Sequence, residues 1–252
     1  MVHHAKASHI GSCLSMADLL AVLYGDVLRV DPSVPDWPER DRLIVSKGHA
    51  AAAMYAVLAA CGFFPRAWLD RYCDDGELLT GHISHKVPGI EVSTGSLGHG
   101  LSIGCGLALA AKRKSLPFRV FVLLSDGELD EGANWEAILF AGHHGLDNLT
   151  AIIDYNGCQG FGAVKEILDM APLADKWRAC HWAVREVDGH DHGQIASALS
   201  SLPFEAEKLG VLVAQTVKGK GVCFMEDQLA WHYKSPDGEQ LSCALNEVGC
   251  PE

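Results

Sequence analysis

The sequence predicts an α/β fold in which a mostly parallel central sheet carries helices on both faces. Short apolar runs and helical stretches alternate along the chain, as in strands that are joined by helical crossovers. The apolar runs are continuous, which is expected for parallel strands covered on both faces. The predicted strands are residues 42–45, 119–124, 149–153, 183–187 and 211–215.

Four stretches between these runs predict helices. The first covers residues 15–28, where apolar residues recur every three or four positions and Ser15 and Asp18 form the expected capping pair. A short polar segment, residues 9–12, precedes it. The other predicted helices are residues 48–61, 100–112 and 132–145.

The domain organisation follows from length and composition. A chain of 252 residues with 48% hydrophobic and 21% charged residues is long enough for one large domain with its own core. No internal repeat, low-complexity tract or long linker divides it. We therefore expect one domain over residues 1–252, with a polar and mobile tail from about residue 236.

The charge balance limits the classes of partner. The 32 acidic residues outnumber the 20 basic ones, and the formal net charge is -12. Such a surface repels nucleic acid and anionic membranes, so neither is expected as a partner. No apolar stretch reaches the roughly 20 residues that span a bilayer. Any anionic ligand needs a local cation or metal ion to overcome this field.

The cysteines indicate the compartment. The nine cysteines show no paired zinc-type spacing, and several lie in apolar runs. This is typical of small buried hydrophobic side chains in a reducing environment. Because no signal-peptide pattern precedes them, we expect a cytoplasmic protein.

Polar residues follow two consecutive predicted strands, at the end where open parallel sheets bind ligands. Asp126 and Gly127 follow one strand, and Asn156 follows the next, thirty positions after Asp126. The intervening helix is long enough for a crossover, so the two strand ends become neighbours. A carboxylate and an amide carbonyl suit a hard divalent cation, whose shell is completed by backbone, water or phosphate oxygens. Gly127 lets a diphosphate approach the main chain closely.

These residues resemble the thiamine-diphosphate fingerprint, a Gly-Asp-Gly start followed one crossover later by Asn, in which Mg²⁺ bridges protein and diphosphate. Ser125 stands in place of the first glycine, a position that is not itself a metal ligand in the family. By matching position, the resemblance implies that Asp126, Asn156 and the backbone carbonyl of Cys158 bind Mg²⁺, or Ca²⁺ or Mn²⁺ in its place. It also implies that Asn156 and the Gly127 N–H contact the cofactor.

The chain has thirteen histidines, and an isolated histidine is more often structural than catalytic. Four of them stand in segments that resemble those of transketolases, in the same order along the chain. These segments are Ser8-His9-Ile10-Gly11-Ser12, Ser46-Lys47-Gly48-His49-Ala50, Thr80-Gly81-His82 and Trp231-His232-Tyr233-Lys234. Residues 91–98 resemble the family's loop that meets the aminopyrimidine ring, and residues 216–221 resemble the segment of its cofactor-contacting lysine. Residues 31–37 and 172–177 also resemble two-component transketolases. The similarity thus covers nearly the whole chain, from about residue 3 to residue 234.

The resemblance also implies roles for these histidines. Transferring the two-carbon end of a ketose moves protons near neutral pH, a task that suits imidazole. His82 is expected beside the reacting two-carbon unit, and His9 and His232 are expected to contact donor oxygens and relay protons. His232 also lies near the diphosphate in the family. The other implied cofactor contacts are Ser12, His49, Gly95, Ser96, Leu97 and Lys218.

Two positions depart from the family pattern, and we expect both to narrow or reshape the sugar channel. Ile83 stands where the family usually has proline, and Tyr233 replaces a common glycine. The histidines at positions 3, 4, 143, 144, 190 and 192 match no family segment, and we expect structural or surface roles for them. Because His143 and His144 are adjacent on a predicted helix, their side chains point apart, which disfavours a shared metal.

The resemblance implies transfer of a two-carbon ketol unit from a ketose, which we expect to be phosphorylated, to an aldehyde acceptor, with thiamine diphosphate carrying the chemistry. The family's cofactor-activating glutamate and phosphate-gripping arginine belong to regions for which the chain shows no counterpart. We therefore expect a partner subunit with a pyrimidine-binding domain, assembled as an α2β2 heteromer, without which the chain is inactive.

Other functions stay open at this point. A related thiamine-dependent enzyme, such as deoxyxylulose-phosphate synthase or a 2-oxoacid dehydrogenase component, shares the cofactor pattern, and so does a specialised two-carbon transferase of a biosynthetic pathway. The four histidines favour a transketolase, because acyl donors without sugar hydroxyls need fewer such contacts. A non-catalytic regulatory or metal-buffering protein is disfavoured by the intact cation ligands. Measuring thiamine diphosphate binding with and without Mg²⁺ separates it from the enzymes.

Overall fold

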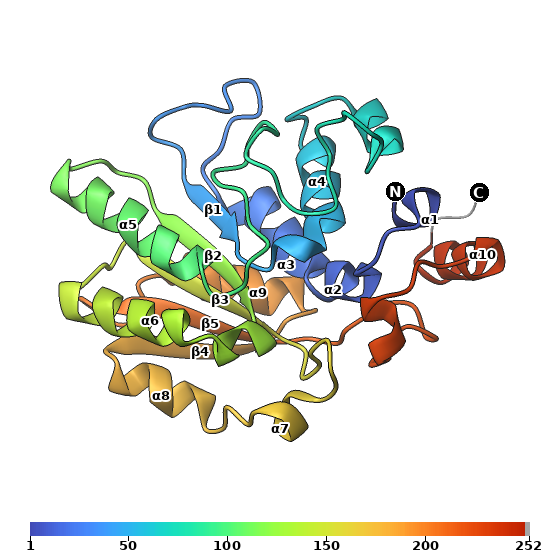
Figure 1. Cartoon of the computed structure of the whole chain (residues 1–252). Helices are drawn as coiled ribbons and strands as arrows, with labels where there is room; N and C mark the ends of the chain where they lie inside the picture. Colours follow the sequence, from blue (N-terminus) through green and yellow to red (C-terminus); the bar gives the residue numbers. More distant parts are fainter. Residues whose placement is uncertain (250–252) are drawn as a thin grey trace.

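The centre of the fold is a sheet of five parallel strands in the order β1-β2-β3-β5-β4 (Figure 1). The structure is a computed structural model that describes residues 1–249. The strands are β1 (Arg42–Val45), β2 (Val120–Ser125), β3 (Leu149–Tyr155), β4 (Trp182–Asp188) and β5 (Leu209–Gln215). Each lies within two residues of a predicted run at either end, which confirms the predicted parallel sheet.

Helices cover both faces of the sheet, as the sequence predicts (Figure 1). One face carries α3 (Ala17–Val22), α4 (Ala51–Ala60) and α9 (His192–Ser200), and the other carries α5 (Gly100–Arg113), α6 (Gly132–His144) and α8 (Leu173–Ala179). The remaining α-helices are α1 (Val2–Ala5), α2 (Ile10–Ser15), α7 (Val164–Ile167) and α10 (Gly238–Glu247). A π-helical turn, η1 (Leu23–Val27), and the 3-10 turns η2 (Gly48–Ala50), η3 (Arg66–Arg71), η4 (Gly127–Asp130) and η5 (Leu229–His232) complete the elements.

The strand side chains enter two separate cores, one on each face. Phe121 and Leu123 of β2 pack into the core beneath α3, α4 and α9, whereas Val120 and Val122 pack into the core beneath α5, α6 and α8. All four side chains are fully buried. Burial on both faces explains why this strand is a continuous apolar run in the sequence.

The predicted helix over residues 15–28 is wrong at its start. The chain is already helical from Ile10 in α2, breaks at Met16, and continues through α3 and η1. Ser15 is the last residue of α2 and is fully buried, and its hydroxyl donates to Asp154 instead of accepting from a backbone N–H at the start of a helix. Asp18 is contacted by His190 and His192. The capping pair is absent because both side chains have tertiary partners.

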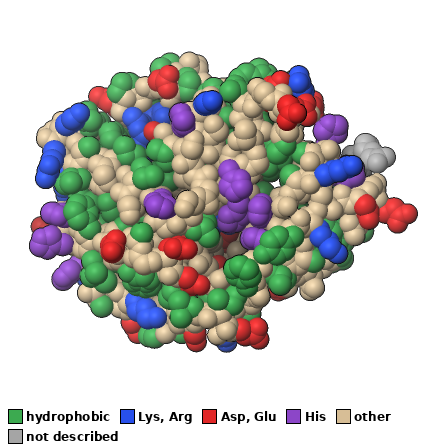
Figure 2. Space-filling view, in the orientation of Figure 1, with side chains coloured by type: hydrophobic (Ala, Val, Ile, Leu, Met, Phe, Trp, Pro, Cys, Tyr) green, Lys and Arg blue, Asp and Glu red, His purple; other side chains and the backbone are tan. Residues whose placement is uncertain are grey.

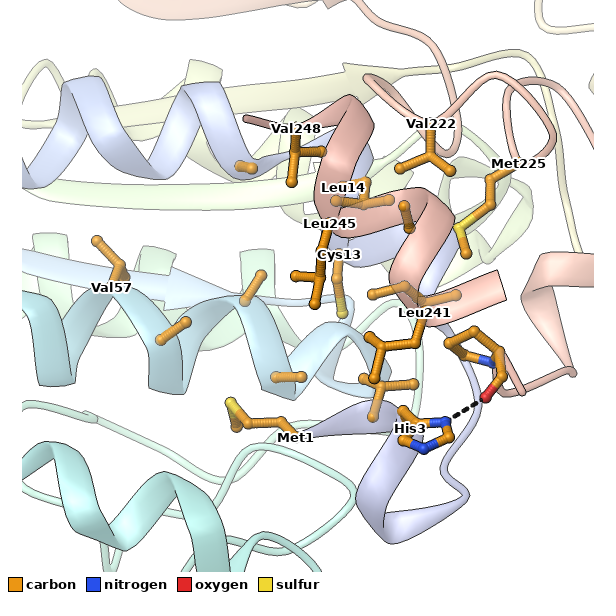
Figure 3. A pocket seen from close by; sticks show the side chains of 18 of the residues that line it. Met1, His3, Cys13, Leu14, Val57, Val222, Met225, Leu241, Leu245 and Val248 are labelled. Atoms are coloured by element: carbon orange, nitrogen blue, oxygen red, sulfur yellow. Dashed lines mark hydrogen bonds between the residues drawn. The ribbon is translucent and has the colours of Figure 1, made fainter. Parts of the chain in front are cut away.

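The segment after Pro236 differs from the expected polar tail. Asp237 accepts a hydrogen bond from the Gln240 N–H at 2.9 Å, the Gln240 side chain accepts from the Asp237 N–H at 3.0 Å, and this capping box begins α10. One side of α10 presents Leu241 and Leu245 to an apolar groove of about 670 Å³ that α2 and α4 line on its other side (Figure 3). His3 contacts the Pro236 carbonyl at 2.7 Å, joining the two ends of the described chain.

No helix within residues 1–249 combines the length and the apolar character that crossing a membrane requires. The eight cysteines in the same range are free, and only Cys13 and Cys105 are buried, so the expectation of small buried side chains is wrong for the others.

Candidate active site

The loops that follow β1, β2, β3 and β5 surround a cavity of about 310 Å³ at the carboxyl edge of the sheet. Parallel sheets bind their ligands at this edge. Figure 2 shows histidine side chains gathered beside a hollow on this face. The predicted site residues that line the cavity are His9, Ser12, His49, His82, Gly95, Leu97, Asp126, Gly127, Asn156, Cys158, Lys218 and His232. Ser96 is exposed and does not line it.

Asp126 begins the loop after β2 and is only 2% exposed. Its Oδ1 accepts a hydrogen bond from the Gly127 N–H at 2.7 Å, and its Oδ2 accepts one from the Gly157 N–H at 2.5 Å. Burial raises the pKa of Asp126 to about 6, and the nearby charge of Asp154 adds to the rise. A carboxylate buried in this way favours a bound cation.

Asn156 and the Cys158 carbonyl complete the oxygen donors around Asp126. The Asn156 Oδ1 accepts a hydrogen bond from the Cys158 N–H at 3.1 Å, and its Nδ2 donates to the Ser15 hydroxyl at 3.1 Å. One carboxylate, one amide oxygen and one carbonyl fit a hard cation such as Mg²⁺ and leave places for phosphate oxygens. Residues 1–249 hold no cluster of three or more His, Cys, Asp or Glu side chains that fits a metal ion. The donor set thus suits a cation shared with a phosphate ligand.

Lys218 enters the site from the loop after β5 and is 1% exposed. Its Nζ donates to the carbonyls of Cys158 at 3.1 Å and Gln159 at 3.4 Å, and it lies 3.2 Å from the His232 Nδ1. Burial lowers the pKa of Lys218. Because a carbonyl oxygen has two lone pairs, the Cys158 carbonyl keeps one for a cation while it accepts from Lys218.

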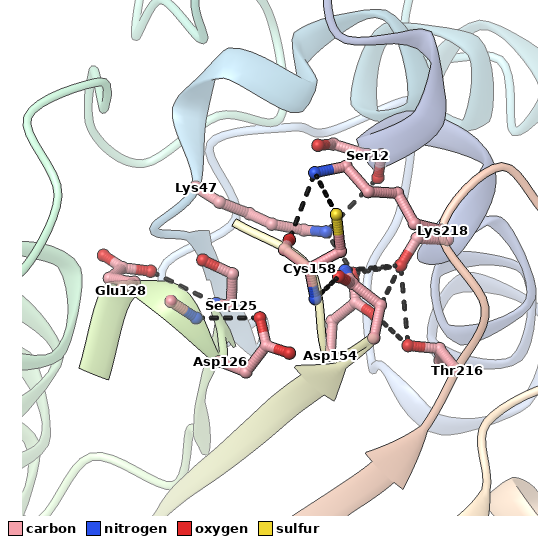
Figure 4. A network of polar contacts seen from close by, with 12 residues as sticks. Ser12, Lys47, Ser125, Asp126, Glu128, Asp154, Cys158, Thr216 and Lys218 are labelled. Atoms are coloured by element: carbon pink, nitrogen blue, oxygen red, sulfur yellow. Dashed lines mark hydrogen bonds and ion pairs between the residues drawn. The ribbon is translucent and has the colours of Figure 1, made fainter. Parts of the chain in front are cut away.

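The site residues predicted from the sequence do not include a buried polar network around Asp154, which lies beneath the site (Figure 4). The Lys47 ammonium forms an ion pair with Asp154, and the hydroxyls of Ser15 and Thr216 also donate to that carboxylate. Lys47 and Asp154 are 1% and 0% exposed. The sequence held a signal for it, because an acidic residue at the end of a buried strand requires a partner.

Glu128 joins the loop after β2 to the loop that contains Gly95 and Leu97. It is fully buried, and it accepts hydrogen bonds from the Ser46 hydroxyl, the Gly98 N–H at 2.8 Å and the Ser125 N–H at 3.3 Å. Burial raises its pKa. Ser125 contributes its backbone N–H here, a contact that serine and glycine make equally well.

Four histidines from distant segments converge on the cavity. The centroid of the His9 ring lies 4.9 Å from the ring centroid of His49, 4.8 Å from that of His232 and 6.2 Å from that of His82. The His9 N–H donates to the His232 carbonyl at 3.1 Å. These are the four histidines singled out from the sequence, and together they form one wall of the cavity.

Three of these imidazoles are held neutral near neutral pH. Burial lowers the pKa of His49 to about 2, and the Lys47 charge adds to this shift. Burial and the Lys218 charge lower the pKa of His232 to about 4. Burial also lowers the pKa of His9. A neutral imidazole has one donor and one acceptor nitrogen, so these rings can hydrogen-bond both hydroxyl and carbonyl groups of a ligand.

Ile83 and Tyr233, the two positions that depart from the family pattern, differ in whether they line the cavity. Ile83 is 4% exposed, belongs to the core beneath α3 and α4, and does not line the cavity, so the expectation that it narrows a channel is wrong. Tyr233 does line the cavity, and its hydroxyl donates to the Gly160 carbonyl at 2.7 Å. It therefore joins the segment after η5 to the loop that contains Gly160 at the cavity.

Two of the remaining histidines have structural contacts, as expected. The His190 Nδ1 lies 2.7 Å from Asp18, and its Nε2 accepts from the Val217 N–H at 2.8 Å. The His192 Nε2 lies 2.7 Å from the same carboxylate. His190 thus holds the backbone beside Lys218 without reaching the cavity.

Comparison with known proteins matches this chain to one family. Residues 1–244 match the model of the transketolase, thiamine diphosphate binding domain. The chain is 42% identical over 248 residues to a subunit of the apulose-4-phosphate transketolase of Phocaeicola vulgatus, an alignment that covers 98% of this chain and 88% of that protein. It is also 42% identical over 241 residues to the 6-deoxy-6-sulfo-D-fructose transketolase subunit SqwG of Clostridium sp., covering 95% and 88% of the two chains.

Solved structures have the same fold. The transketolase from Campylobacter jejuni superposes with a TM-score of 0.94 at 30% identity over 99% of this chain. The transketolase from Leishmania mexicana gives a TM-score of 0.92, also at 30% identity over 99% of this chain. The chain spans 40% and 39% of these two proteins, and therefore corresponds to less than half of either.

Proposed function

Because the chain belongs to the transketolase family, we propose that it is the diphosphate-binding subunit of a two-polypeptide transketolase. In this proposal the assembled enzyme transfers a two-carbon ketol unit from a ketose to an aldehyde acceptor. The main support for this proposal is that four histidines and a set of oxygen donors suited to a cation line the same cavity. The four imidazoles suit sugar hydroxyl and carbonyl groups, and the donor set suits a metal-bound diphosphate.

The cofactor in this proposal is thiamine diphosphate with Mg²⁺, or Ca²⁺ or Mn²⁺. When bound, the cofactor would accept the electron pair that is released when the bond beside the ketose carbonyl breaks. We assign Asp126, Asn156 and the Cys158 carbonyl to the cation, and the Gly127 N–H to the diphosphate. Ser12, His49, Gly95, Ser96, Leu97, Asn156, Lys218 and His232 are the proposed cofactor contacts. The buried Lys218 cation supports this assignment, because the net-negative chain otherwise repels a diphosphate.

The histidines have separate proposed roles. His82 is exposed at the cavity and is assigned to the reacting two-carbon unit. His9 and His232 are assigned to the donor carbonyl and hydroxyl oxygens and to proton relay. Their lowered pKa values keep both rings neutral, so each offers one donor and one acceptor nitrogen to these oxygens.

A partner subunit with a pyrimidine-binding domain is part of the proposal. Glu128 is the single glutamate that lines the cavity among the described residues, and three hydrogen bonds already engage it. It is therefore a poor candidate for the cofactor-activating glutamate. Two relatives that are named as transketolase subunits are matched over 88% and 87% of their length, which supports a subunit of similar extent. We propose an α2β2 assembly, with residues 1–252 as one diphosphate-binding domain.

The donor is proposed to be a ketose with an anionic end group. One similar protein is named for a sugar phosphate and another for a sulfo sugar, and each has 42% sequence identity to this chain. We propose a phosphorylated ketose.

Calorimetric titration of the complex of this chain and its partner subunit with thiamine diphosphate, with and without Mg²⁺, tests the cofactor assignment. We expect binding that requires the cation. Equal affinity in the presence and absence of Mg²⁺ would contradict the metal-bridged site, and no binding under either condition would favour a non-catalytic protein.

A further inference from the structure

The Ser15 hydroxyl lies between a buried carboxylate and the amide of Asn156. It is 2.6 Å from both oxygens of Asp154, and it accepts a hydrogen bond from the Asn156 Nδ2 at 3.1 Å. Ser15 is fully buried at the end of α2, where the helix breaks. No role in the site follows from its position in the sequence, where it resembles a helix cap.

Asp154 is kept ionised and can only accept hydrogen bonds. The Lys47 ammonium forms an ion pair with it, and the hydroxyls of Ser15 and Thr216 both donate to it, so every neighbour that contacts this carboxylate is a cation or a hydrogen-bond donor. An ionised carboxylate has no proton to donate. The single hydroxyl proton of Ser15 is therefore directed at Asp154.

The direction of the Ser15 hydroxyl proton determines the orientation of the Asn156 amide. Once Ser15 donates to Asp154, its oxygen can only accept from Asn156, and the neighbouring group must offer an N–H. The NH₂ end of the Asn156 amide thus faces Ser15, and its carbonyl oxygen faces the opposite side. On that side Oδ1 lies 3.1 Å from the Cys158 nitrogen, in the loop that also contributes the Cys158 carbonyl.

We propose that Ser15, oriented by the Lys47–Asp154 ion pair, is a positioning residue that fixes the Asn156 amide with its oxygen toward the bound cation. This inference rests on the proposed function, because it concerns the cation of the same site. Lys47 has a second effect. It neutralises Asp154 and so leaves Asp126 as the anionic ligand, without a second uncompensated carboxylate beneath the site.

Thr216 offers a matched control. Its hydroxyl donates to the same carboxylate as the Ser15 hydroxyl, but no hydrogen bond joins it to Asn156. Ser15→Ala and Thr216→Val each remove one hydroxyl donor from Asp154. Only Ser15→Ala also removes the acceptor of the Asn156 NH₂ group, which leaves the Cys158 N–H as the remaining hydrogen bond that orients the amide. If the network merely stabilises the fold, both variants should affect the site alike.

The experiment measures Mn²⁺ binding to the complex of the full chain and its partner subunit at saturating thiamine diphosphate, by electron paramagnetic resonance of the free ion. Groups that orient a metal ligand typically change metal affinity about 10- to 100-fold, so Ser15→Ala should weaken Mn²⁺ binding by about that factor. Thr216→Val should bind Mn²⁺ nearly as the wild type does. Circular dichroism establishes that each variant is folded. Should Ser15→Ala not fold, Ser15→Cys keeps the volume, accepts a hydrogen bond only weakly, and should show the same direction of change.

A second background separates orientation from general stability. In Asn156→Asp both side-chain oxygens are equivalent, so the orientation of the group no longer matters. Adding Ser15→Ala to this variant should therefore reduce the Mn²⁺ affinity much less than it does in the wild type. Equal loss of Mn²⁺ affinity in Ser15→Ala and Thr216→Val, or the same loss in both backgrounds, would overturn the positioning role. Absence of Mn²⁺ binding by the wild-type complex would overturn the proposed cation site and this inference with it.

Discussion

The ring of His9 lies 4.9 Å from the ring of His49, although forty positions of sequence separate the two residues. The approach depends on two elements, since His9 immediately precedes α2 and His49 lies in η2 after β1. The contact places a proposed proton-relaying imidazole beside a proposed cofactor-binding one. Substitutions in the two groups should therefore affect catalysis and cofactor binding differently.

Asp126→Ala should abolish or severely weaken binding of thiamine diphosphate. The change removes the one anionic cation ligand and leaves the diphosphate facing a chain of net charge -12. Calorimetry in the presence of Mg²⁺ measures the affinity. Asp147→Ala is the control, because it removes an equal charge from an exposed position outside the cavity. Unchanged affinity in Asp126→Ala would show that the cation is held elsewhere.

His82→Ala should lower kcat while leaving cofactor affinity close to that of the wild type. Its proposed contacts are to the reacting two-carbon unit, so it acts mainly in the transition state. His49→Ala should chiefly weaken cofactor binding. Steady-state rates of the assembled enzyme and calorimetry on the same variants separate the two effects. Equal loss of cofactor affinity in both variants would contradict the division of roles.

The half-buried His49 should make folding less favourable as the pH falls. Its pKa is about 2 in the folded chain, against an ordinary value of 6.5, so below pH 6.5 the unfolded chain binds a proton that the folded chain does not. The free energy of unfolding should fall by up to about 1.4 kcal/mol per pH unit from this group alone. Urea unfolding between pH 7.5 and pH 5 measures the slope.

His49→Gln should reduce that slope, and His143→Gln, on the exposed end of α6, is the matched control. A slope that His49→Gln leaves unchanged would mean that this imidazole is not held neutral by the fold.

Gly48→Ala should destabilise the loop beside the cavity. An added Cβ would lie 2.2 Å from the Thr94 carbonyl oxygen, so one backbone must move, at a cost on the order of 1–3 kcal/mol. Gly106→Ala is the control, because nothing lies within 4 Å of its added Cβ and alanine favours the helix α5. Urea unfolding compares the two. Equal stability of both variants would show that the loop is free to shift.

The sheet and most of the site were predictable because their signals are local in the sequence. Strand β2 is a continuous apolar run, and Asp126 follows it directly, so the place of Asp126 at the edge of the sheet follows from the topology. The four histidines stand in short segments that resemble those of a known family. Those segments predicted which residues converge, although not the distances between them.

The buried position of Asp154 indicates that it has a partner, but the partners themselves were not predictable because their contacts join distant parts of the chain. Ser15 and Asp154 are 139 positions apart, and either residue alone suggests a helix cap or an ordinary acidic side chain. The helix break at Met16 and the position of Ile83 in the core have the same origin, since tertiary packing determined both. Helix α10 was missed because its polar composition resembles that of an irregular tail.

The central claim is that this chain supplies half of a shared active site. The direct measurement is the steady-state rate of ketol transfer from a ketose phosphate to an aldehyde, with a fixed amount of this chain and increasing amounts of the pyrimidine-domain partner. With no partner present the rate should be at background, and it should rise and saturate as the partner approaches the amount of this chain. Full activity in the absence of partner would contradict the account, because it would require a cofactor-activating group within this chain.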